Sequence, residues 1–307
     1  MFYLADCLHI RIFVERKYVM EMKYWLVTTD HLEDDLWFRD DDDFRRGMNG
    51  VAVLAAHEPV FVLAFILMSN HVHFVLAGER KDAESFINKF KCAHSRYLQQ
   101  KYGVKEPLRG NKVHIAELES EGEAREKALA YTQMNCVAAN ICAFPSAYPW
   151  GSGACFFNAT SPRGVLVKDL SKSKRFQILH SKIAIPETWR IDNGYVTPES
   201  YVAVKAVESI FGTPKRMNYF LRNSSKAKLR MESGESSLPS FRDQLVVAAI
   251  PDICWTLFKK NSFKSLSDSE KGESLRQIRF RFGSNVHQMA RTTGQTYDEV
   301  ARLLDSY

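Results

Sequence analysis

Residues 60–77 read VFVLAFILMSNHVHFVLA, and this stretch decides the fold. It contains two apolar runs, Val60–Met68 and His71–Ala77, separated by the polar pair Ser69–Asn70. Apolar runs of this length joined by a short polar turn are typical of a β-hairpin. The longer run has nine residues, too few to cross a bilayer. We therefore expect two antiparallel strands and no membrane contact.

The segments on either side of the hairpin add further strands and helices. The aromatic and β-branched stretch Tyr24–Thr29 predicts a strand, and Val113–Leu118 predicts another. Helical spacing of apolar residues predicts three helices. The first begins at the acidic run Asp40–Asp43 and ends before Pro59, and the others span Asp82–Tyr102 and Gly122–Ala139. The order β-α-β-β-α-β-α predicts an α+β fold, a ferredoxin-like antiparallel sheet with helices on one face.

The composition is that of an ordinary globular protein. The 307 residues are 45% hydrophobic and 25% charged, which excludes a disordered chain, a collagen-like repeat and a coiled-coil rod. The net charge of +6 is divided unevenly: residues 1–155 hold 18 Lys+Arg and 21 Asp+Glu, whereas residues 156–307 hold 24 and 15. This asymmetry suggests a catalytic front half and a back half that binds a polyanion.

The cysteines and the first residues point to a cytoplasmic protein. The six cysteines form no C-x-x-C pair and lie among apolar residues, so we expect buried free thiols in a reducing compartment; they are Cys7, Cys92, Cys136, Cys142, Cys155 and Cys254. Charges interrupt the first twenty residues, so no signal-peptide core is present there. Translation could begin at Met1, Met20 or Met22.

The chain divides into three predicted regions. The stretch PSAYPWGSG at 145–153 ends the first region, residues 1–155, and a predicted linker over Asn223–Pro239 lies in the second, residues 156–245. The third, residues 246–307, is predicted to be mainly helical. Capping boxes at Ser267-x-x-Glu270 and Thr296-x-x-Glu299 precede helices ending near Phe282 and Leu304, with a short helix over Val286–Thr292 between them. A helix, a turn containing Gly294 and a second helix form a helix-turn-helix pattern.

The hairpin also carries the first candidate for chemistry. Residues two apart on a strand point to the same side, so His71 and His73 project together while Val72 packs into the core. Two imidazoles on one rigid surface can form half of a divalent-cation site. Two ordinary half-buried histidines are the alternative interpretation.

A second candidate lies on the predicted helix Gly122–Ala139. Tyr131 and Asn135 are four residues apart and share one helix face. An Asn carbonyl can be an oxygen ligand, and a Tyr hydroxyl can be a nucleophile. Taken alone, such a tyrosine is more often a packing aromatic.

Together these residues resemble a known family. The NHVH stretch at 70–73, then Tyr131-x-x-x-Asn135, then Tyr148-Pro149-Trp150, is similar to the HUH tyrosine transposases, in particular the REP-associated tyrosine transposases of bacteria. The resemblance covers roughly residues 20–155. The sequence departs from the family pattern at Ser69 and Cys136, where the family usually has proline, and lacks its Trp-containing stretch around 109–114.

The resemblance implies a mechanism and a set of ligands. Its metal, Mg²⁺ or Mn²⁺, would be held by His71, His73 and Asn135, and Tyr131 would be the nucleophile. Enzymes of this family cleave single-stranded DNA beside a hairpin, form a 5′-phosphotyrosine intermediate and rejoin strands. A domesticated DNA-binding regulator and an HUH relaxase or replication initiator are alternatives on the same fold. The family includes monomers and homodimers, and both states stay open.

Other residues are candidates for DNA contact or rivals for the site. Basic residues Lys89, Lys91 and Arg96 could contact single-stranded DNA or be a solvated helix face. The tail resembles helix-turn-helix domains that bind duplex DNA, which would place Tyr297, Asp298 and Ala301 in the major groove. A packing motif within a helical domain is the alternative interpretation. Phosphate contacts would come from Arg276, Arg279 and Arg291. We expect Tyr97, Tyr102, His94 and His114 to be structural and Asp40–Asp43 to be a solvated helix cap.

Overall fold

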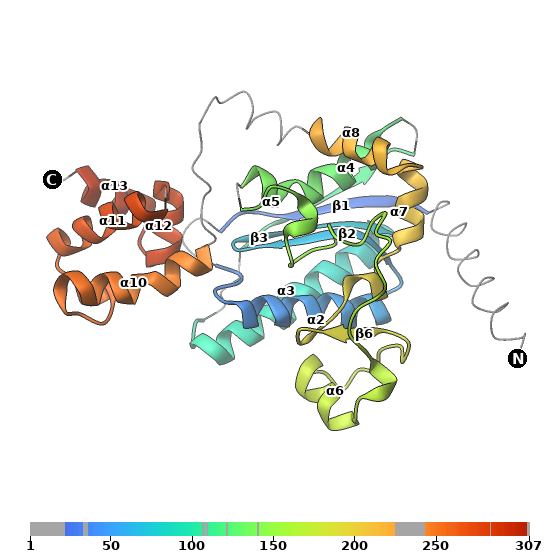
Figure 1. The fold of residues 1–307 in the computed structure, drawn as a ribbon, viewed down its shortest axis with the longest axis horizontal. Coiled ribbons are helices and arrows are strands. Elements are labelled where there is room, and N and C mark those ends of the chain that lie inside the picture. Colours follow the sequence, from blue (N-terminus) through green and yellow to red (C-terminus); the bar gives the residue numbers. More distant parts are fainter. Residues whose placement is uncertain are drawn as a thin grey trace, which may run out of the picture.

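A computed structural model (Figure 1) describes residues 22–32, 36–105, 108, 110–120, 122–139, 141–224, 243–282 and 284–305. The alternative starts at Met1 and Met20, Cys7, and most of the predicted linker lie outside these residues. No helix in the described ranges is long and apolar enough to cross a membrane.

The centre of the molecule is a four-stranded antiparallel sheet, as predicted. Its strands are β1 (Tyr24–Thr29), β2 (Phe61–Met68), β3 (His71–Ala77) and β4 (Val113–Leu118), in the spatial order β2-β3-β1-β4. Helix α2 (Asp41–His57) connects β1 to β2, and α3 (Arg80–Tyr102) connects β3 to β4. The α+β class and the order β-α-β-β-α-β therefore agree with the sequence prediction.

Helices α2 and α3 cover one face of the sheet (Figure 1). The rings of Phe86 and Phe90 on α3 pack edge-to-face on Phe74 of β3, 5.4 and 5.6 Å between centroids. Asp40 caps α2 by accepting a hydrogen bond from the Asp43 backbone N–H. The predicted cap is present, but Asp43 itself is fully buried and not solvated.

Helices also cover the opposite face, so the prediction of helices on one face only was wrong. The second layer consists of α4 (Ala124–Gln133), α5 (Asn135–Ala138), α7 (Val204–Phe211) and α8 (Pro214–Arg222) (Figure 1). All of β3 and all but the first residue of β2 are buried, which requires cover on both faces. Arg216 of α8 also forms an ion pair with Glu126 of α4, 2.9 Å from nitrogen to oxygen.

Residues 141–202 wrap the β2 edge and the outer side of α2. The Leu67 N–H donates to the Trp150 carbonyl, so the stretch predicted as a domain exit lies along β2. A small sheet of β5 (Val165–Leu166), β6 (Arg190–Asp192) and β7 (Tyr195–Val196) packs on α2 together with α6 (Lys172–Leu179). The largest core cluster runs from Tyr24 to Phe220 and so continues past the boundary predicted at residue 155.

The C-terminal helices have a core of their own. They are α10 (Asp243–Phe258), α11 (Asp268–Phe282), α12 (Val286–Thr293) and α13 (Tyr297–Asp305). Both predicted capping boxes begin helices: Ser267 and Glu270 exchange hydrogen bonds, and the Thr296 hydroxyl accepts from the Glu299 N–H at 3.2 Å. Gly294 at φ 68° ends α12, a conformation that favours glycine. The described residues also form the short 3₁₀ helices η1 (Pro145–Ala147), η2 (Val167–Asp169), η3 (Pro198–Ser200) and η4 (Phe263–Ser265).

The described cysteines are free thiols, as expected, but not all of them are buried. Cys136, Cys155 and Cys254 are buried, Cys142 is half-buried and Cys92 on α3 is exposed. A hydrogen bond with Cys142 that favours the protonated thiol, together with burial, raises the pKa of Cys136.

Candidate functional site

The structure brings His71 and His73 together on β3, on the face that α4 covers. Their ring centroids are 4.8 Å apart with the planes nearly perpendicular, and the side chains are 5% and 2% exposed. The intervening Val72 is fully buried, and the next residue, Phe74, packs on α3. The period-two alternation of β3 therefore separates the imidazoles from the α3 side of the core.

Tyr131 of α4 lies beside the histidine pair. Its ring contacts His73 edge-to-face at 5.6 Å between centroids. Tyr131 and His73 line a cavity of about 450 Å³ with residues 28–31 at the end of β1. Burial raises the pKa of the Tyr131 phenol, so the hydroxyl keeps its proton in the resting protein.

The end of β1 adds two residues that the sequence did not single out, Asp30 and His31. Thr28 of β1 pairs with His73 on one side and with His114 of β4 on the other, so the three lie in one row across the sheet. Asp30 lines the small cavity and contacts His114, 2.6 Å from Oδ1 to Nε2. That hydrogen bond lowers the pKa of the Asp30 carboxyl. His114, expected to be structural, thus has a carboxylate partner at the edge of the site.

The ring of His71 is held from two directions. The imidazole of His31 stacks on it at 3.8 Å, with 10° between the planes. The Asn70 side-chain oxygen lies 2.9 Å from His71 Nδ1. Both contacts restrict rotation of the imidazole.

Asn135 lies one helical turn after Tyr131, and its side chain is oriented by its own helix. Its Nδ2 donates to the carbonyls of Tyr131 at 2.9 Å and Thr132 at 3.2 Å, and the residue is 2% exposed. A side chain that bonds to carbonyls three and four residues earlier competes with the helical backbone. The predicted helix 122–139 is accordingly interrupted at Met134, between α4 and α5.

The two histidines of β3 are the starting point for a metal site. No group of three or more His, Cys, Asp or Glu side chains with metal-site geometry exists among the described residues. A cation at His71 and His73 would therefore need an oxygen of another kind, from the Asn135 amide, water or a substrate. Oxygen donors suit both Mg²⁺ and Mn²⁺, whereas imidazole is a less usual ligand for either, so oxygens from Asn135, water and substrate would have to supply most of the coordination.

The predicted basic residues of α3 lie on the other side of the sheet from the histidines. Lys89 forms an ion pair with Glu58, and Lys91 donates to the carbonyl of Asn111. Arg96 is exposed. Because α3 covers the Phe74 face, Lys89 points away from the histidines, whereas Lys91 lies close to Asp30 at the edge of the small cavity through its bond to Asn111.

The rival aromatic and histidine residues have structural contacts. Tyr97 and Tyr102 both donate hydrogen bonds to Asp43, and burial is the main cause that raises the pKa of each phenol. His94 is 3% exposed, and its Nε2 lies 2.6 Å from the Trp37 carbonyl oxygen. Burial lowers the pKa of His94 to about 4. These contacts agree with the structural roles expected from the sequence.

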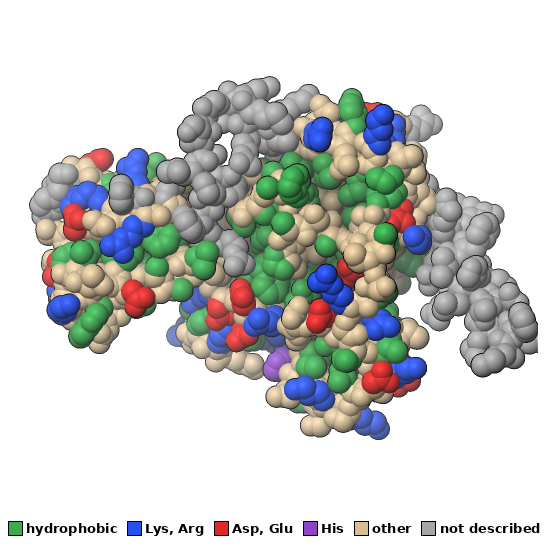
Figure 2. All heavy atoms as spheres, in the orientation of Figure 1, with side chains coloured by type: hydrophobic (Ala, Val, Ile, Leu, Met, Phe, Trp, Pro, Cys, Tyr) green, Lys and Arg blue, Asp and Glu red, His purple; other side chains and the backbone are tan. Residues whose placement is uncertain are grey.

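The predicted DNA contacts of the C-terminal helices differ from one another. Arg291 is 17% exposed at its side chain and ion-paired with Asp243, and Arg276 contacts Glu273. Arg279, Tyr297 and Asp298 are exposed, and Ala301 is half-buried. Figure 2 shows Lys and Arg interspersed with Asp and Glu over these helices, on its left side.

The positive charge of the back half does not reside in the helix-turn-helix region. Residues 156–242 hold 15 Lys+Arg against 7 Asp+Glu, whereas residues 243–307 hold 9 against 8. A bulk electrostatic attraction between the C-terminal helices and DNA phosphates is therefore not expected.

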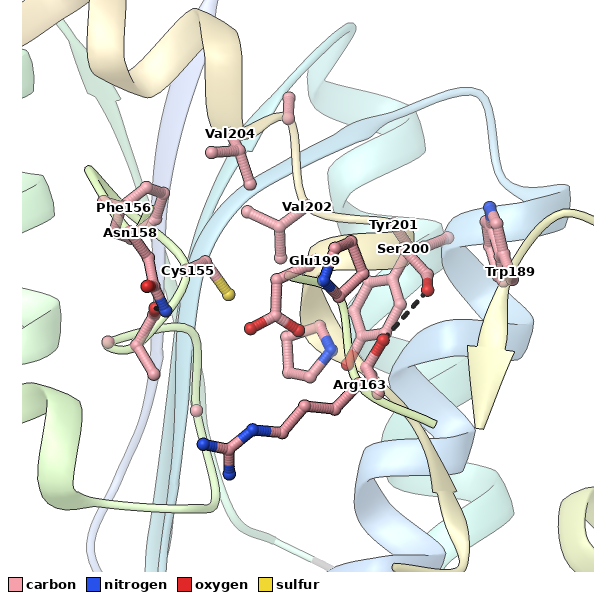
Figure 3. A pocket seen from close by; sticks show the side chains of 18 of the residues that line it. Cys155, Phe156, Asn158, Arg163, Trp189, Glu199, Ser200, Tyr201, Val202 and Val204 are labelled. Atoms are coloured by element: carbon pink, nitrogen blue, oxygen red, sulfur yellow. Dashed lines mark hydrogen bonds between the residues drawn. The ribbon is translucent and has the colours of Figure 1, made fainter. Parts of the chain in front are cut away.

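A larger cavity of about 1280 Å³ lies between residues 145–163 and 186–208 (Figure 3). Figure 3 shows Glu199 and Arg163 reaching into the space between Cys155 and Tyr201. Four carboxylate residues and two cationic residues line it, an excess of negative charge that opposes a phosphate backbone; they are Glu58, Asp192, Glu199, Glu208, Arg163 and Lys205.

Comparisons with known proteins found one distant likeness. No family model and no curated protein matches the sequence. Among solved structures, the chain is similar to a REP-associated tyrosine transposase bound to a REP hairpin. The two are 12% identical over 55% of this chain and 86% of that chain, with a TM-score of 0.35.

Proposed function

We propose that the protein is a metal-dependent transposase that cleaves and rejoins single-stranded DNA through a covalent bond to Tyr131. The observation that carries the proposal is the contact between the Tyr131 ring and His73 in one small cavity, next to His71. A nucleophile beside a phosphate-activating site is the arrangement that tyrosine-based strand cleavage requires. The NHVH and Tyr131-x-x-x-Asn135 motifs support the same interpretation.

The metal in this proposal is Mg²⁺ or Mn²⁺, held by His71, His73 and Asn135. When bound, it would polarise a phosphate oxygen and stabilise the negative charge of the transition state. The Asn135 carbonyl oxygen is the group its side chain can offer, because Nδ2 already donates to two backbone carbonyls. Three protein ligands would leave coordination positions for the substrate.

The covalent step transfers a phosphoryl group without net hydrolysis. The Tyr131 oxygen forms a bond to phosphorus, the bond to the DNA 3′-oxygen breaks, and the phenol proton ends on the released 3′-hydroxyl. Because burial raises the Tyr131 pKa, an acceptor must take that proton during attack. Among the described residues, Asp30 is the carboxylate that lines the cavity with Tyr131. The reverse reaction rejoins a strand without ATP.

The C-terminal helices would bring the enzyme to its target. The helix-turn-helix of α12 and α13 presents Tyr297 and Asp298 at the exposed start of α13. With little net charge in this region, we propose that it contributes specificity through base contacts more than affinity through phosphates. Single-stranded or hairpin DNA is the proposed substrate, and duplex DNA the proposed ligand of the C-terminal region.

The test is cleavage of a labelled oligonucleotide that contains a hairpin and single-stranded flanks. Full-length protein with Mg²⁺ or Mn²⁺ should produce a shorter strand and a protein-linked strand on a denaturing gel, and EDTA should stop both. Tyr131→Phe should produce neither, whereas Tyr97→Phe serves as the matched control and should cleave. Binding of the oligonucleotide without cleavage by wild-type protein would refute the enzyme and favour a DNA-binding regulator.

A further inference from the structure

Backbone hydrogen bonds from Leu32, Trp37 and Phe38 hold the turn between β2 and β3. The Leu32 N–H donates to the Asn70 carbonyl at 2.9 Å, and the N–H groups of Trp37 and Phe38 donate to the Ser69 carbonyl. Asn70 is 7% exposed. Its side chain therefore has one defined environment, directly before His71.

The hydrogen bonds of Asn70 determine which way its amide points. Nδ2 lies 3.0 Å from the Leu32 carbonyl oxygen. A carbonyl can only accept, so the amide NH₂ must face Leu32, and Oδ1 must face His71. Oδ1 is 2.9 Å from His71 Nδ1 and can only accept as well. The proton of this bond must therefore be on Nδ1.

This bond selects one tautomer of the neutral imidazole. With Nδ1 protonated, Nε2 carries the lone pair and is the nitrogen that can ligate a cation. A histidine ligand is commonly oriented in this way by a partner on its other nitrogen. The stacked ring of His31, at 3.8 Å, holds the plane of the same imidazole.

We propose that Asn70 is a positioning residue that keeps His71 in the Nδ1–H tautomer, with Nε2 presented to the metal. The part that concerns the metal rests on the proposed function, and the part that concerns the tautomer does not. The competing explanation is that Asn70 only ties the turn to Leu32, which would make its contact with His71 incidental.

Three variants separate these roles. Asn70→Ala removes both the acceptor for His71 and the donor to Leu32. Asn70→Asp keeps an acceptor for Nδ1–H and loses the donor to Leu32. Asn111→Ala is the matched control, because Asn111 Nδ2 donates to the neighbouring Asp30 carbonyl at 2.9 Å and the described contacts of its side chain do not include His71.

The first measurement is a long-range ¹H–¹⁵N correlation spectrum of full-length, metal-free protein at a pH where His71 is neutral. We expect the Nδ1–H tautomer for His71 in wild type, Asn70→Asp and Asn111→Ala, and a mixture of tautomers in Asn70→Ala. An Nε2–H tautomer in the wild-type protein would overturn the proposal, whatever the variants show and even if one of them folds poorly.

The second measurement is titration with MnCl₂ by calorimetry. We expect Asn70→Ala to bind Mn²⁺ about 10- to 100-fold more weakly than wild type, the usual effect of losing such a partner. Asn70→Asp and Asn111→Ala should stay within about threefold of wild type by the same reasoning. Equal weakening in Asn70→Asp and Asn70→Ala would show that the Leu32 contact is what matters, and would contradict the proposal. If wild type binds no Mn²⁺, the proposed function fails, and the spectrum still decides the tautomer.

Discussion

The two faces of the central sheet use the same kinds of residue for different purposes. On the α3 face, a buried histidine and two tyrosines, His94, Tyr97 and Tyr102, have hydrogen bonds to a backbone carbonyl or to Asp43. On the α4 face, His73 and Tyr131 line a small cavity, and the neighbouring His71 has its Nδ1 2.9 Å from the Asn70 side-chain oxygen. The difference shows that an adjacent cavity, rather than residue type or burial, distinguishes the candidate reaction site from the structural cluster.

The largest contrast should come from replacing one histidine on each face. His73→Ala should lower cleavage at least about 100-fold, because a metal ligand contributes several kcal/mol to the transition state. His94→Ala should leave cleavage of the folded protein within a few-fold but reduce the free energy of unfolding by about 2–4 kcal/mol, because it leaves a cavity and an unpaired Trp37 carbonyl. Urea denaturation and single-turnover cleavage measure the two effects. Loss of cleavage in His94→Ala with normal cleavage in His73→Ala would refute the comparison.

Acid should destabilise the protein through the α3 face. The pKa of His94 falls from 6.5 to about 4 on folding, so between these values the unfolded chain binds a proton that the native state does not. The free energy of unfolding should therefore decrease as pH falls from 6.5 to 4, by up to about 3 kcal/mol from this residue. His94→Gln should flatten that part of the curve in urea denaturation at several pH values. If the free energy of unfolding of His94→Gln decreases as steeply over this pH range, titratable groups other than His94 cause the effect.

A smaller effect is expected from the tyrosine on the α3 face. Tyr97→Phe removes one hydrogen bond to the buried Asp43, which still accepts from Tyr102, Lys101 and the Arg39 N–H. We expect a loss of about 1–2 kcal/mol in stability and no loss of cleavage. Thermal unfolding and the oligonucleotide assay test this together. Loss of cleavage at unchanged stability would make Tyr97 a rival nucleophile.

The smallest effect should come from the basic residues of α3. Since Lys89 is paired with Glu58 and Lys91 with a backbone carbonyl, their replacement by Ala should cost about 0–1 kcal/mol each in stability. The salt dependence of oligonucleotide affinity should not change. A slope reduced by about 0.7 for each lysine replaced would show that they contact single-stranded DNA after all. Fluorescence anisotropy at several salt concentrations supplies the slopes.

The local pattern of residues predicted the strands well, because each strand carries its own signal. The bounds of β1 and β4 agree with the prediction, and β2 begins one residue later, at Phe61. The run FVLAFILM does not alternate between apolar and polar residues, which was a signal that both faces are covered. Part of the cover, α7 and α8, comes from residues more than 130 positions later, and no local pattern shows such a contact.

The candidate site was predictable only where its residues follow a fixed period. The spacing of His71 and His73 on a strand, and of Tyr131 and Asn135 along a helix, can be deduced from the sequence. Asp30 and His31 join them because of the register between β1 and β3, which the sequence does not determine. The break at Met134 was missed because it depends on how the Asn135 side chain bonds to its own helix.

The most direct measurement is to map the covalent bond between protein and DNA. Full-length protein is incubated with the hairpin oligonucleotide and Mn²⁺, then digested with nuclease and protease, and the modified peptide is fragmented in a mass spectrometer. We predict a nucleotide linked through its 5′-phosphate to Tyr131. An adduct on Tyr97, Tyr102 or Tyr148, or cleavage with no adduct, would contradict the role of the α4 face as the site of reaction.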